Sequence, residues 1–481
     1  MNYSNLSLHT DKYQINMMYA HWVQGSLNKK AVFEAYFRKL PFGNGYAVFA
    51  GLERIVHYIQ HLKFDDEVID YLRQQEEAYQ EGFLEELRNF RFTGCIRAVP
   101  EGTLVFPNVP IIRVEARIFE AQLIETAILN FMNYQTLIAT KASRIKQVAP
   151  HDMLLEFGTR RAQEADAAVW GARAAYIAGF HATSNLRAGL LFGIPTKGTH
   201  AHAWIQAHDT EEEAFAKFAE ALPDQVSLLV DTYDTLKSGV PNAIKTAKLL
   251  EAKGKKLQSI RLDSGDLALI SKEARAMLDS AGFPYVKIIA SNDLDENLIM
   301  NLKAQGARID VWGVGTQLIT AADQPSLGGI YKLVAKENKD GDYQPVIKIS
   351  GNPEKVSNPG VKETYRLLNR QSGRAEADYI ALGSEEEARE GAPLLLFDPA
   401  TPYRSKTLHD YDSVRLLHDI YVNGELVYEL PAVEAIRAYH ESQLTLFRPE
   451  IRRMLNPEEY RITLSRKAWD LKMELIHEYH P

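Results

Sequence analysis

Short apolar runs recur through the middle of the chain, and each run ends in small or polar residues. They fall at 153–157, 176–180, 190–194, 227–230, 259–262, 286–290 and 309–312. Stretches with helical spacing separate them, and apolar strands that alternate with helices are typical of parallel β/α units. The pattern predicts an irregular or incomplete α/β barrel, with an open, doubly wound parallel sheet as the alternative.

The segments on either side of this region mix helix and strand patterns. Residues 16–22 predict a helix that opens near Thr10, 31–38 and 111–114 predict strands, and 120–144 has helical spacing. The charged stretch 335–345 is interpreted as a solvated loop leaving the barrel, and 432–480 as mostly amphipathic helix. We therefore expect three segments: an α+β segment over 1–145, the barrel with the active site over 146–335, and a C-terminal segment over 336–481. The last of these is expected to pack with the first, forming a flanking α+β domain.

Composition narrows the class of protein. The chain has 481 residues, and 55 Lys and Arg against 63 Asp and Glu give a net charge of −8. This mild acidity argues against a protein that binds along nucleic acid, because such proteins usually carry an excess of Lys and Arg. A single cysteine, Cys95, excludes an intrachain disulfide, and the apolar neighbours of Cys95 predict a buried position in a strand. Since neither a signal peptide nor an apolar run of about 18 residues is seen, we expect a cytoplasmic protein without a membrane partner.

Candidate chemistry lies directly after the predicted strands. In parallel β/α architectures ligands bind at the carboxyl ends of the strands. These ends carry cations, carboxylates, histidines and glycine turns: 158–161, 183–185, 195–202, 231–234, 263–266, 291–293 and 313–316. Arginine binds phosphate oxygens in a planar, bidentate way, and backbone N–H groups at glycine turns bind phosphate as well. Carboxylates accept hydrogen bonds from ribose hydroxyls or hold Mg²⁺, so the set suits a phosphorylated sugar.

Several of these residues also have a purely structural interpretation. Asp231, Asp234 and Asp266 could each cap the helix that follows them. His200 and His202 share a face of an extended segment, yet no second His or Cys cluster completes a zinc site. Arg261 lies inside a predicted strand, where an unpaired arginine would be costly, and this favours a site.

Motifs of other common enzymes are absent from the sequence. It has no P-loop, no dinucleotide fingerprint after a strand, no G-x-S-x-G and no H-E-x-x-H. P-loop kinases, Rossmann dehydrogenases and serine hydrolases are thereby disfavoured.

Taken in order, the motifs resemble those of the nicotinate phosphoribosyltransferases, type II phosphoribosyltransferases. The resemblance runs from about residue 8 to the C-terminal helices, over 10–14, 99–102, 137–141, 156–162, 183–185, 198–202, 261–267, 313–316 and 359–362. It implies transfer of phosphoribose from phosphoribosyl pyrophosphate to nicotinate, giving nicotinate mononucleotide and pyrophosphate, in NAD salvage. It also implies a homodimer in which an N-terminal tyrosine, here Tyr13, completes the active site of the other subunit.

The resemblance further implies roles for individual residues. ATP hydrolysis is coupled through a phosphorylated histidine, which the G-T-x-x-H pattern places at His202. Arg160, Arg261 and Mg²⁺ would neutralise the leaving pyrophosphate, and Asp263 would hold the ribose hydroxyls. The 5′-phosphate would lie against the Asn292 turn, Gly315 and Thr316, and Gly313 is expected among the substrate-binding residues. Phe157 and Tyr13 would sandwich the pyridine ring. The donor for the nicotinate carboxylate stays open among Arg161, Thr183, Ser184 and backbone amides.

Three other functions remain open on the sequence alone. The first is a nicotinamide-specific enzyme, because such enzymes share the fold and the phosphate machinery. The second is a barrel lyase or isomerase acting on a sugar phosphate, with Lys197 as a Schiff base. The third is a nucleotide-binding regulatory protein without turnover.

Overall fold

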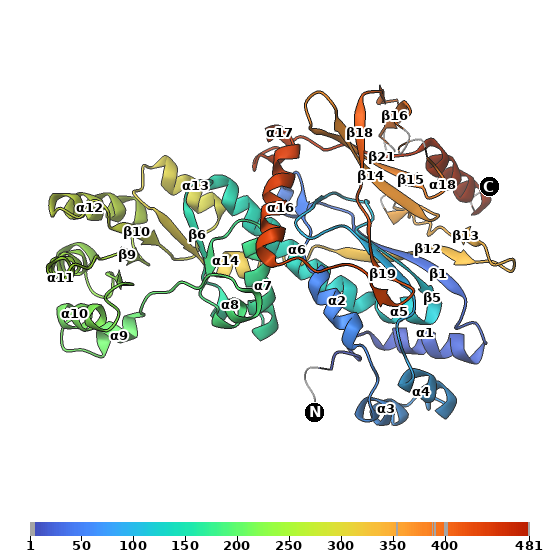
Figure 1. The fold of residues 1–481 in the computed structure, drawn as a ribbon, viewed down its shortest axis with the longest axis horizontal. Coiled ribbons are helices and arrows are strands. Elements are labelled where there is room, and N and C mark those ends of the chain that lie inside the picture. The colour runs from blue at the N-terminus through green and yellow to red at the C-terminus, as the bar shows by residue number, and fades with distance from the viewer. Residues whose placement is uncertain (1–4, 353–354, 387, 389–390, 399–402, 480–481) are drawn as a thin grey trace. The chain divides into compact units, whose positions relative to one another are not determined.

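The chain divides into two compact units in the computed structural model (Figure 1). The structure describes residues 5–352, 355–386, 388, 391–398 and 403–479. One unit combines residues 1–137 with 326–481, and the other comprises 138–325. The N- and C-terminal segments therefore fold together, as the sequence analysis expects of the flanking domain.

A six-stranded parallel sheet forms the centre of unit 138–325. Its order is β7-β6-β11-β10-β9-β8, and every neighbouring pair is parallel. The strands are β6 Met153–Glu156, β7 Ala182–Thr183, β8 Ser227–Leu229, β9 Ser259–Leu262, β10 Lys287–Ala290 and β11 Val311–Val314. The first strand of the unit, β6, pairs with the last, β11, as in a closed barrel, and the ring of consecutive strands is open between β7 and β8. The sheet is therefore an incomplete α/β barrel, which confirms the predicted fold class.

Helices follow the strands of this sheet, and polar side chains begin many of them. They are α7 Ala165–Ile177, α8 Leu186–Phe192, α9 His202–Gln206, α10 Glu211–Ala221, α11 Val240–Ala252, α12 Leu267–Ser280, α13 Glu296–Ala304 and α14 Thr316–Ile319. The short helical turns η2 Thr159–Arg161 and η3 Thr235–Gly239 complete the unit. Asn185, Thr210 and Asp295 each accept a hydrogen bond from an amide of the first turn of their helix. Such caps satisfy backbone donors that a helix start leaves without partners.

Two of the seven predicted strands are wrong, because both segments belong to helices. The run 176–180 contains the end of α7, which stops before Gly179 at φ +106°, and 190–194 contains the end of α8, which stops at Gly193 at φ +71°. A short apolar run fits a helix end as well as a strand, and a glycine at positive φ is the usual helix stop. The strand that was missed is the two-residue β7.

The other unit contains two main sheets built from both ends of the chain. The larger is antiparallel, in the order β13-β12-β1-β5-β3-β19-β20, so that β12, which follows the barrel in sequence, pairs with β1. The smaller has the order β18-β14-β15-β21, in which β21 runs parallel to β15. The strands are β1 Lys30–Phe37, β2 Ala47–Val48, β3 Cys95–Ala98, β4 Leu104–Val105, β5 Ile112–Arg117, β12 Gly329–Glu337, β13 Tyr343–Pro345, β14 Lys362–Asn369, β15 Ala375–Leu382, β16 Leu394–Phe397, β17 Ser405–Leu408, β18 Tyr411–Arg415, β19 His418–Val422, β20 Glu425–Leu426 and β21 Ile462–Leu464.

Helices of this unit come mostly from its two ends. They are α1 Lys12–Val23, α2 Leu52–His61, α3 Asp66–Arg73, α4 Glu81–Arg88, α5 Ile118–Leu123, α16 Val433–Leu446, α17 Pro449–Arg452 and α18 Arg466–Tyr479, with the short turn η1 Pro41–Gly43. Helix α6, Glu125–Val148, continues from this unit into the other. The predicted helix near Thr10 and the predicted strands at 31–38 and 111–114 correspond to α1, β1 and β5.

Two local expectations in this unit are corrected. Residues 335–345 are not a loop, because β12 and β13 pair as an antiparallel hairpin there. Cys95 lies in a strand, β3, but it is half-buried rather than buried, and its thiol contacts Asn423.

A fully buried ion pair joins β14 and β15, and it generates a stability prediction. Arg366 donates to both carboxylate oxygens of Asp378, each at 2.8 Å, and the two side chains are 2% and 0% exposed. We expect Asp378→Ala to lower the free energy of unfolding by about 3–5 kcal/mol, because it leaves a buried guanidinium without its carboxylate. Denaturant unfolding of the whole chain measures this.

The matched control is the exposed pair formed by Arg370, directly after β14, and Asp412 in β18, whose Nε and Oδ1 atoms lie 2.9 Å apart. Asp412→Ala should cost no more than about 1 kcal/mol, because water solvates both partners. Equal losses in the two variants would contradict the assignment of stability to the buried pair.

Candidate active site

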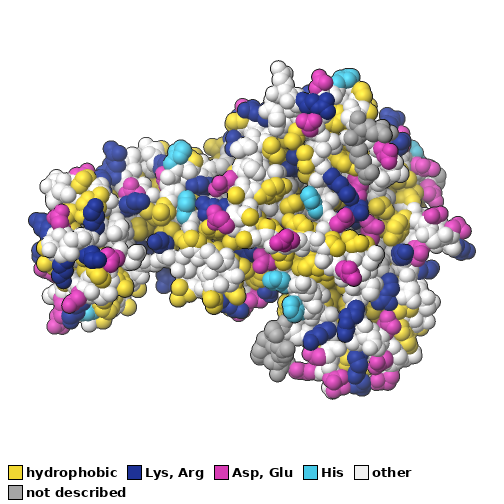
Figure 2. Space-filling view, viewed as in Figure 1, with side chains coloured by type: hydrophobic (Ala, Val, Ile, Leu, Met, Phe, Trp, Pro, Cys, Tyr) yellow, Lys and Arg dark blue, Asp and Glu magenta, His cyan; other side chains and the backbone are white. Residues whose placement is uncertain are grey.

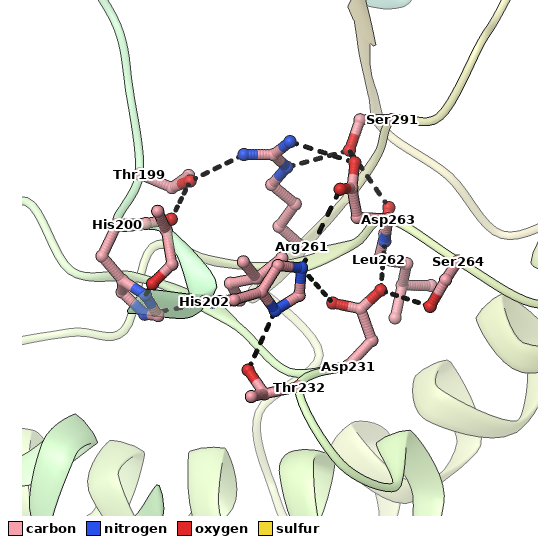
Figure 3. Close-up of polar contacts among 12 residues, drawn as sticks. Thr199, His200, His202, Asp231, Thr232, Arg261, Leu262, Asp263, Ser264 and Ser291 are labelled. Atoms are coloured by element: carbon pink, nitrogen blue, oxygen red, sulfur yellow. Dashed lines mark hydrogen bonds and ion pairs between the residues drawn. The ribbon is translucent and has the colours of Figure 1, made fainter. Parts of the chain in front are cut away.

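The carboxyl ends of β8, β9 and β10 bring charged residues together with the 199–202 segment (Figure 3). Parallel pairing aligns these ends, so residues some 30 positions apart in sequence become neighbours. The cluster contains Thr199, His202, Asp231, Thr232, Arg261, Asp263, Ser264 and Ser291.

Arg261 is held at three points. Its Nη2 donates to Asp263 Oδ1 at 3.0 Å, its Nε to Ser291 Oγ at 2.9 Å and its Nη1 to Thr199 Oγ1 at 3.1 Å. Ser291 Oγ also donates to Asp263 Oδ1. The partner that the sequence analysis required for an arginine within a strand is thus present, and the guanidinium is fixed before any ligand binds.

Asp231 connects two strand ends and is not a helix cap. Its Oδ2 accepts from the Asp263 amide at 2.9 Å and from Ser264 Oγ at 2.7 Å. Its Oδ1 is buried and has no hydrogen-bond partner among the described residues. Asp234 and Asp266, by contrast, cap η3 and α12, so the structural interpretation holds for those two.

His202 is the first residue of α9 and is partly exposed. Its Nδ1 lies 3.1 Å from Thr232 Oγ1, and its Nε2 lies 4.0 Å from both Asp231 Oδ1 and Asp263 Oδ2. Two carboxylates near Nε2 favour the tautomer that carries its proton there. The Nδ1 lone pair then accepts from the Thr232 hydroxyl.

His200, two residues earlier, has a structural role. Its Nε2 accepts from the Leu229 amide at 3.2 Å, so its Nδ1 carries the proton, and it lies 3.3 Å from the Ala201 carbonyl oxygen. Burial lowers the pKa of His200, which keeps the ring neutral. With both nitrogens bonded to backbone, His200 is not placed to bind a metal.

An aromatic ring lies beside the charged cluster. The Arg261 guanidinium carbon is 5.5 Å from the centroid of the Phe157 ring, a cation–π arrangement. A Cβ at Gly313 would lie 2.6 Å from Phe157 Cδ2, so glycine is the residue that leaves room for this ring. The fit at Gly315 is also close, since a Cβ added there would lie 3.2 Å from the Phe157 carbonyl oxygen.

Thr183 and Ser184 differ in their availability. Thr183 Oγ1 donates to Glu156 Oε2 at 2.6 Å and accepts from the Asn185 amide at 3.0 Å, and Thr183 is buried. Its one hydroxyl proton is therefore already used. Ser184 is exposed, and its amide donates to the Glu156 carbonyl oxygen at 2.9 Å.

The remaining predicted site residues of this unit lie at other strand ends. Arg160 and Arg161 are exposed in η2, and no hydrogen bond or ion pair of their side chains is found among the described residues. Asn292 is exposed after β10, in a turn where it and Asp293 have φ values of +95° and +43°. Thr316 begins α14 after β11. Tyr13 belongs to the other unit, where it lies in α1 and is half-exposed.

Sequence reasoning gave no role to four residues that organise this site. Thr199, Thr232 and Ser291 are short hydroxyl side chains, and only the structure shows that they contact Arg261 or His202. Glu156 lies within the motif 156–162, and the motif alone indicates no role for it. The signal available for it was a carboxylate at the end of an otherwise apolar strand.

Helix length and surface charge bear on where such a site could operate. None of the helices in the described part of the chain is both long and apolar enough to cross a bilayer. Acidic and basic side chains are interspersed over the face seen in Figure 2.

A parallel half-barrel with arginines and carboxylates at its strand ends defines an α/β-barrel enzyme site for a phosphorylated ligand. The chain matches the family models described as the nicotinate phosphoribosyltransferase (NAPRTase) N-terminal domain, over residues 8–133, and C-terminal domain, over residues 361–472. It belongs to the nicotinate phosphoribosyltransferase family of enzymes.

Individual relatives match over nearly the whole chain. It is 55% identical to the nicotinate phosphoribosyltransferase of Bacillus subtilis (strain 168), over 98% of this chain and 96% of the relative. It is 32% identical to the nicotinate phosphoribosyltransferase of Homo sapiens, over 98% and 97%. The crystal structure of human nicotinic acid phosphoribosyltransferase superposes with a TM-score of 0.87 at 30% identity, covering 97% of this chain and 99% of that one.

Proposed function

We propose that this protein catalyses the reaction for which its relatives are named, with nicotinate and phosphoribosyl pyrophosphate giving nicotinate mononucleotide and pyrophosphate. The observation that carries the proposal is the cluster of Arg261, Asp263, Asp231 and His202 at the carboxyl edge of the parallel sheet. Identity of 55% to the Bacillus subtilis enzyme over nearly the whole chain supports it.

Departure of pyrophosphate is the step that needs help. The pyridine nitrogen forms a bond to the ribose C1 while the C1–O bond to pyrophosphate breaks, and pyrophosphate leaves with the electron pair. Positive charge develops on the sugar and negative charge on the leaving group. Arg261, already oriented, and Arg160, free to move, are the cations we assign to the leaving group.

Two carboxylates fit a magnesium ion bound together with the substrate. Asp231 Oδ1 is a buried acceptor without a hydrogen-bond partner in the described part of the chain, and Asp263 lies beside it. No group of three or more His, Cys, Asp or Glu side chains suited to a metal occurs among the described residues. Mg²⁺ usually binds through one or two carboxylates plus substrate phosphates and water, which agrees with such a pair. When bound it would neutralise charge on the pyrophosphate.

Other strand ends suit the rest of the two substrates. Asp263 accepts hydrogen bonds from ribose hydroxyls, and the 5′-phosphate lies against the backbone at Asn292 and Gly315 and the Thr316 hydroxyl, whereas Gly313 lies inside β11 against the Phe157 ring. The nicotinate ring packs on Phe157. Because the Thr183 hydroxyl is already committed, we assign the nicotinate carboxylate to Ser184 and Arg161 rather than to Thr183.

ATP is used through His202. With its proton on Nε2, facing Asp231 and Asp263, the Nδ1 lone pair attacks the γ-phosphorus of ATP, and ADP leaves. The Thr232 hydroxyl donates to this lone pair and orients the ring in the free protein, and it gives up that hydrogen bond when Nδ1 attacks. A phosphate on His202 places negative charge beside the substrate site and thereby changes the affinity for phosphoribosyl pyrophosphate or for product.

The decisive assay measures product formation from phosphoribosyl pyrophosphate and Mg²⁺. Either nicotinate or nicotinamide is supplied, each with and without ATP. We expect nicotinate mononucleotide to form, faster or further with ATP and with release of ADP. Turnover of nicotinamide instead would contradict the assignment of the base, and binding of nicotinate mononucleotide without turnover would indicate a regulatory protein. A covalent adduct trapped on Lys197 by borohydride would indicate a lyase. The structure argues against that outcome, because Lys197 is exposed and Schiff-base lysines are usually desolvated.

His202→Ala tests the coupling to ATP. We expect this variant to lose ATP stimulation and ADP release while it retains slow, ATP-independent synthesis, because the groups assigned to pyrophosphate stay in place. His200→Asn is the matched control, since His200 bonds only to backbone in the structure. Continued ATP stimulation in His202→Ala would contradict the role of His202.

Tyr13 tests whether two chains share an active site. We propose a homodimer in which Tyr13 of one chain packs on the nicotinate bound to the other. Tyr13→Ala and Arg261→Ala chains should each be inactive alone. Random mixing should restore about a quarter of the wild-type activity, because half of the dimers are hybrids with one intact site of two. No recovery in a mixture proven to contain hybrid dimers would contradict a shared site.

A further inference from the structure

Glu156 is a buried carboxylate beside the site, and the proposed reaction does not use it. It ends β6, directly before Phe157, and is 1% exposed. No Lys, Arg or His lies within ion-pair distance of it among the described residues. Burial raises the pKa of Glu156, while hydrogen bonds from Thr183 and Gly158 oppose this effect.

Both carboxylate oxygens of Glu156 are occupied by donors from different segments. Oε1 accepts from the Gly158 amide, and Oε2 accepts from Thr183 Oγ1 at 2.6 Å. The backbone adds a third link, because the Glu156 carbonyl oxygen accepts from the Ser184 amide at 2.9 Å. Glu156 therefore ties the turn after β6 to the end of β7.

These two segments carry the residues assigned to the base. The Gly158 carbonyl oxygen accepts from the Arg161 amide at 2.8 Å, so the position of Gly158 sets the η2 turn that bears Arg160 and Arg161. The fit around Gly158 is tight, since a Cβ there would lie 2.6 Å from Ile319 Cβ and 2.8 Å from Glu156 Oε1. On the other side, Thr183 is followed by the exposed Ser184.

We infer that Glu156 is a positioning residue for nicotinate, which fixes the 157–161 turn against the 183–185 segment and holds the Thr183 hydroxyl away from the ligand. This inference rests on the proposed function for its substrate. The two hydrogen bonds from Gly158 and Thr183 to Glu156, called the clamp below, are a property of the free protein. Burying a carboxylate without a cation lowers the stability of the fold, and the hydrogen bonds that Glu156 accepts offset this loss only while their geometry is kept.

Two substitutions separate geometry from charge. In Glu156→Gln the amide oxygen can accept from Gly158 and the amide nitrogen can donate to Thr183 Oγ1. Both segments then stay linked, while the charge is removed and the Thr183 hydroxyl proton is released. In Glu156→Ala both links are lost. We expect Glu156→Ala to lower kcat/KM for nicotinate about tenfold or more, mainly through KM, and Glu156→Gln to stay within about threefold of wild type.

The control variant is Ser227→Ala, which removes a buried hydrogen bond of the same sheet at the amino ends of β8 and β9. Ser227 Oγ lies 2.7 Å from Ser259 Oγ there. Ser227→Ala should leave KM for nicotinate unchanged, even where it lowers thermal stability as much as Glu156→Ala does.

Hydrogen–deuterium exchange of the full chain without substrate gives a second readout. Glu156→Ala should speed exchange in 157–161 and 183–185, whereas Glu156→Gln and Ser227→Ala should not. Unchanged exchange and unchanged KM in Glu156→Ala would overturn the inference. An equal loss of kcat/KM for nicotinate in Glu156→Gln and Glu156→Ala would overturn it as well. If the wild-type protein fails to use nicotinate but the exchange pattern appears, the clamp stands and the proposed function fails.

Discussion

The ion pair between Arg261 and Asp263 is the interaction on which the site depends. An arginine inside a parallel sheet needs a carboxylate, and Asp263, two residues further on, supplies it. The amide of Asp263 in turn binds Asp231, and both aspartates lie 4.0 Å from His202 Nε2. Orienting one guanidinium therefore also fixes the two carboxylates that face the histidine. The parallel register of β8, β9 and β10 makes this possible, because it aligns the ends of all three strands.

Strands buried on both faces could be predicted from the sequence, while helix ends could not be separated from them. Residues 259–262 and 286–290 were predicted correctly, because Ile260 and Leu262 in the first run and Ile288 and Ala290 in the second are buried apolar side chains of a covered sheet. Residues 176–180 are just as apolar because α7 is itself a buried helix. Residues 190–194 misled for a different reason, since Leu190 in α8 is 84% exposed. Nothing in the residue types distinguishes an exposed apolar helix from a buried strand, except the glycine that ends it.

The confusion of helix ends with strands also determined which part of the site could be predicted from the sequence. Arg261 and Asp263 follow from one strand, and Asp231 follows from the alignment of strand ends. His202 follows only from the G-T-x-x-H pattern of the resembled family, because the segment 190–194 before it contains a helix end. The link between Glu156 and Thr183 spans 27 residues and depends on β7, which was not predicted. Without that strand, Thr183 was interpreted as a free hydroxyl that could meet the nicotinate carboxylate. The register of β6 and β7 brings Glu156 opposite Thr183, and this pairing commits the hydroxyl.

Charge balance connects the cluster to the proposed chemistry. Arg261 carries one positive charge and Asp231 and Asp263 carry two negative ones, so these three side chains together are net negative before a highly anionic pyrophosphate group arrives. Arg160 and Arg161 are the nearest cations in sequence to the aromatic ring, and their freedom means that side-chain entropy is lost when they bind. Arg261 is already oriented and loses little, so its contribution is available as the C1–O bond breaks. Of the two arginines assigned to pyrophosphate, we therefore expect Arg261 to act mainly in the transition state and Arg160 mainly in holding the pyrophosphate group of the bound substrate. The excess negative charge is the reason a divalent cation suits the two aspartates.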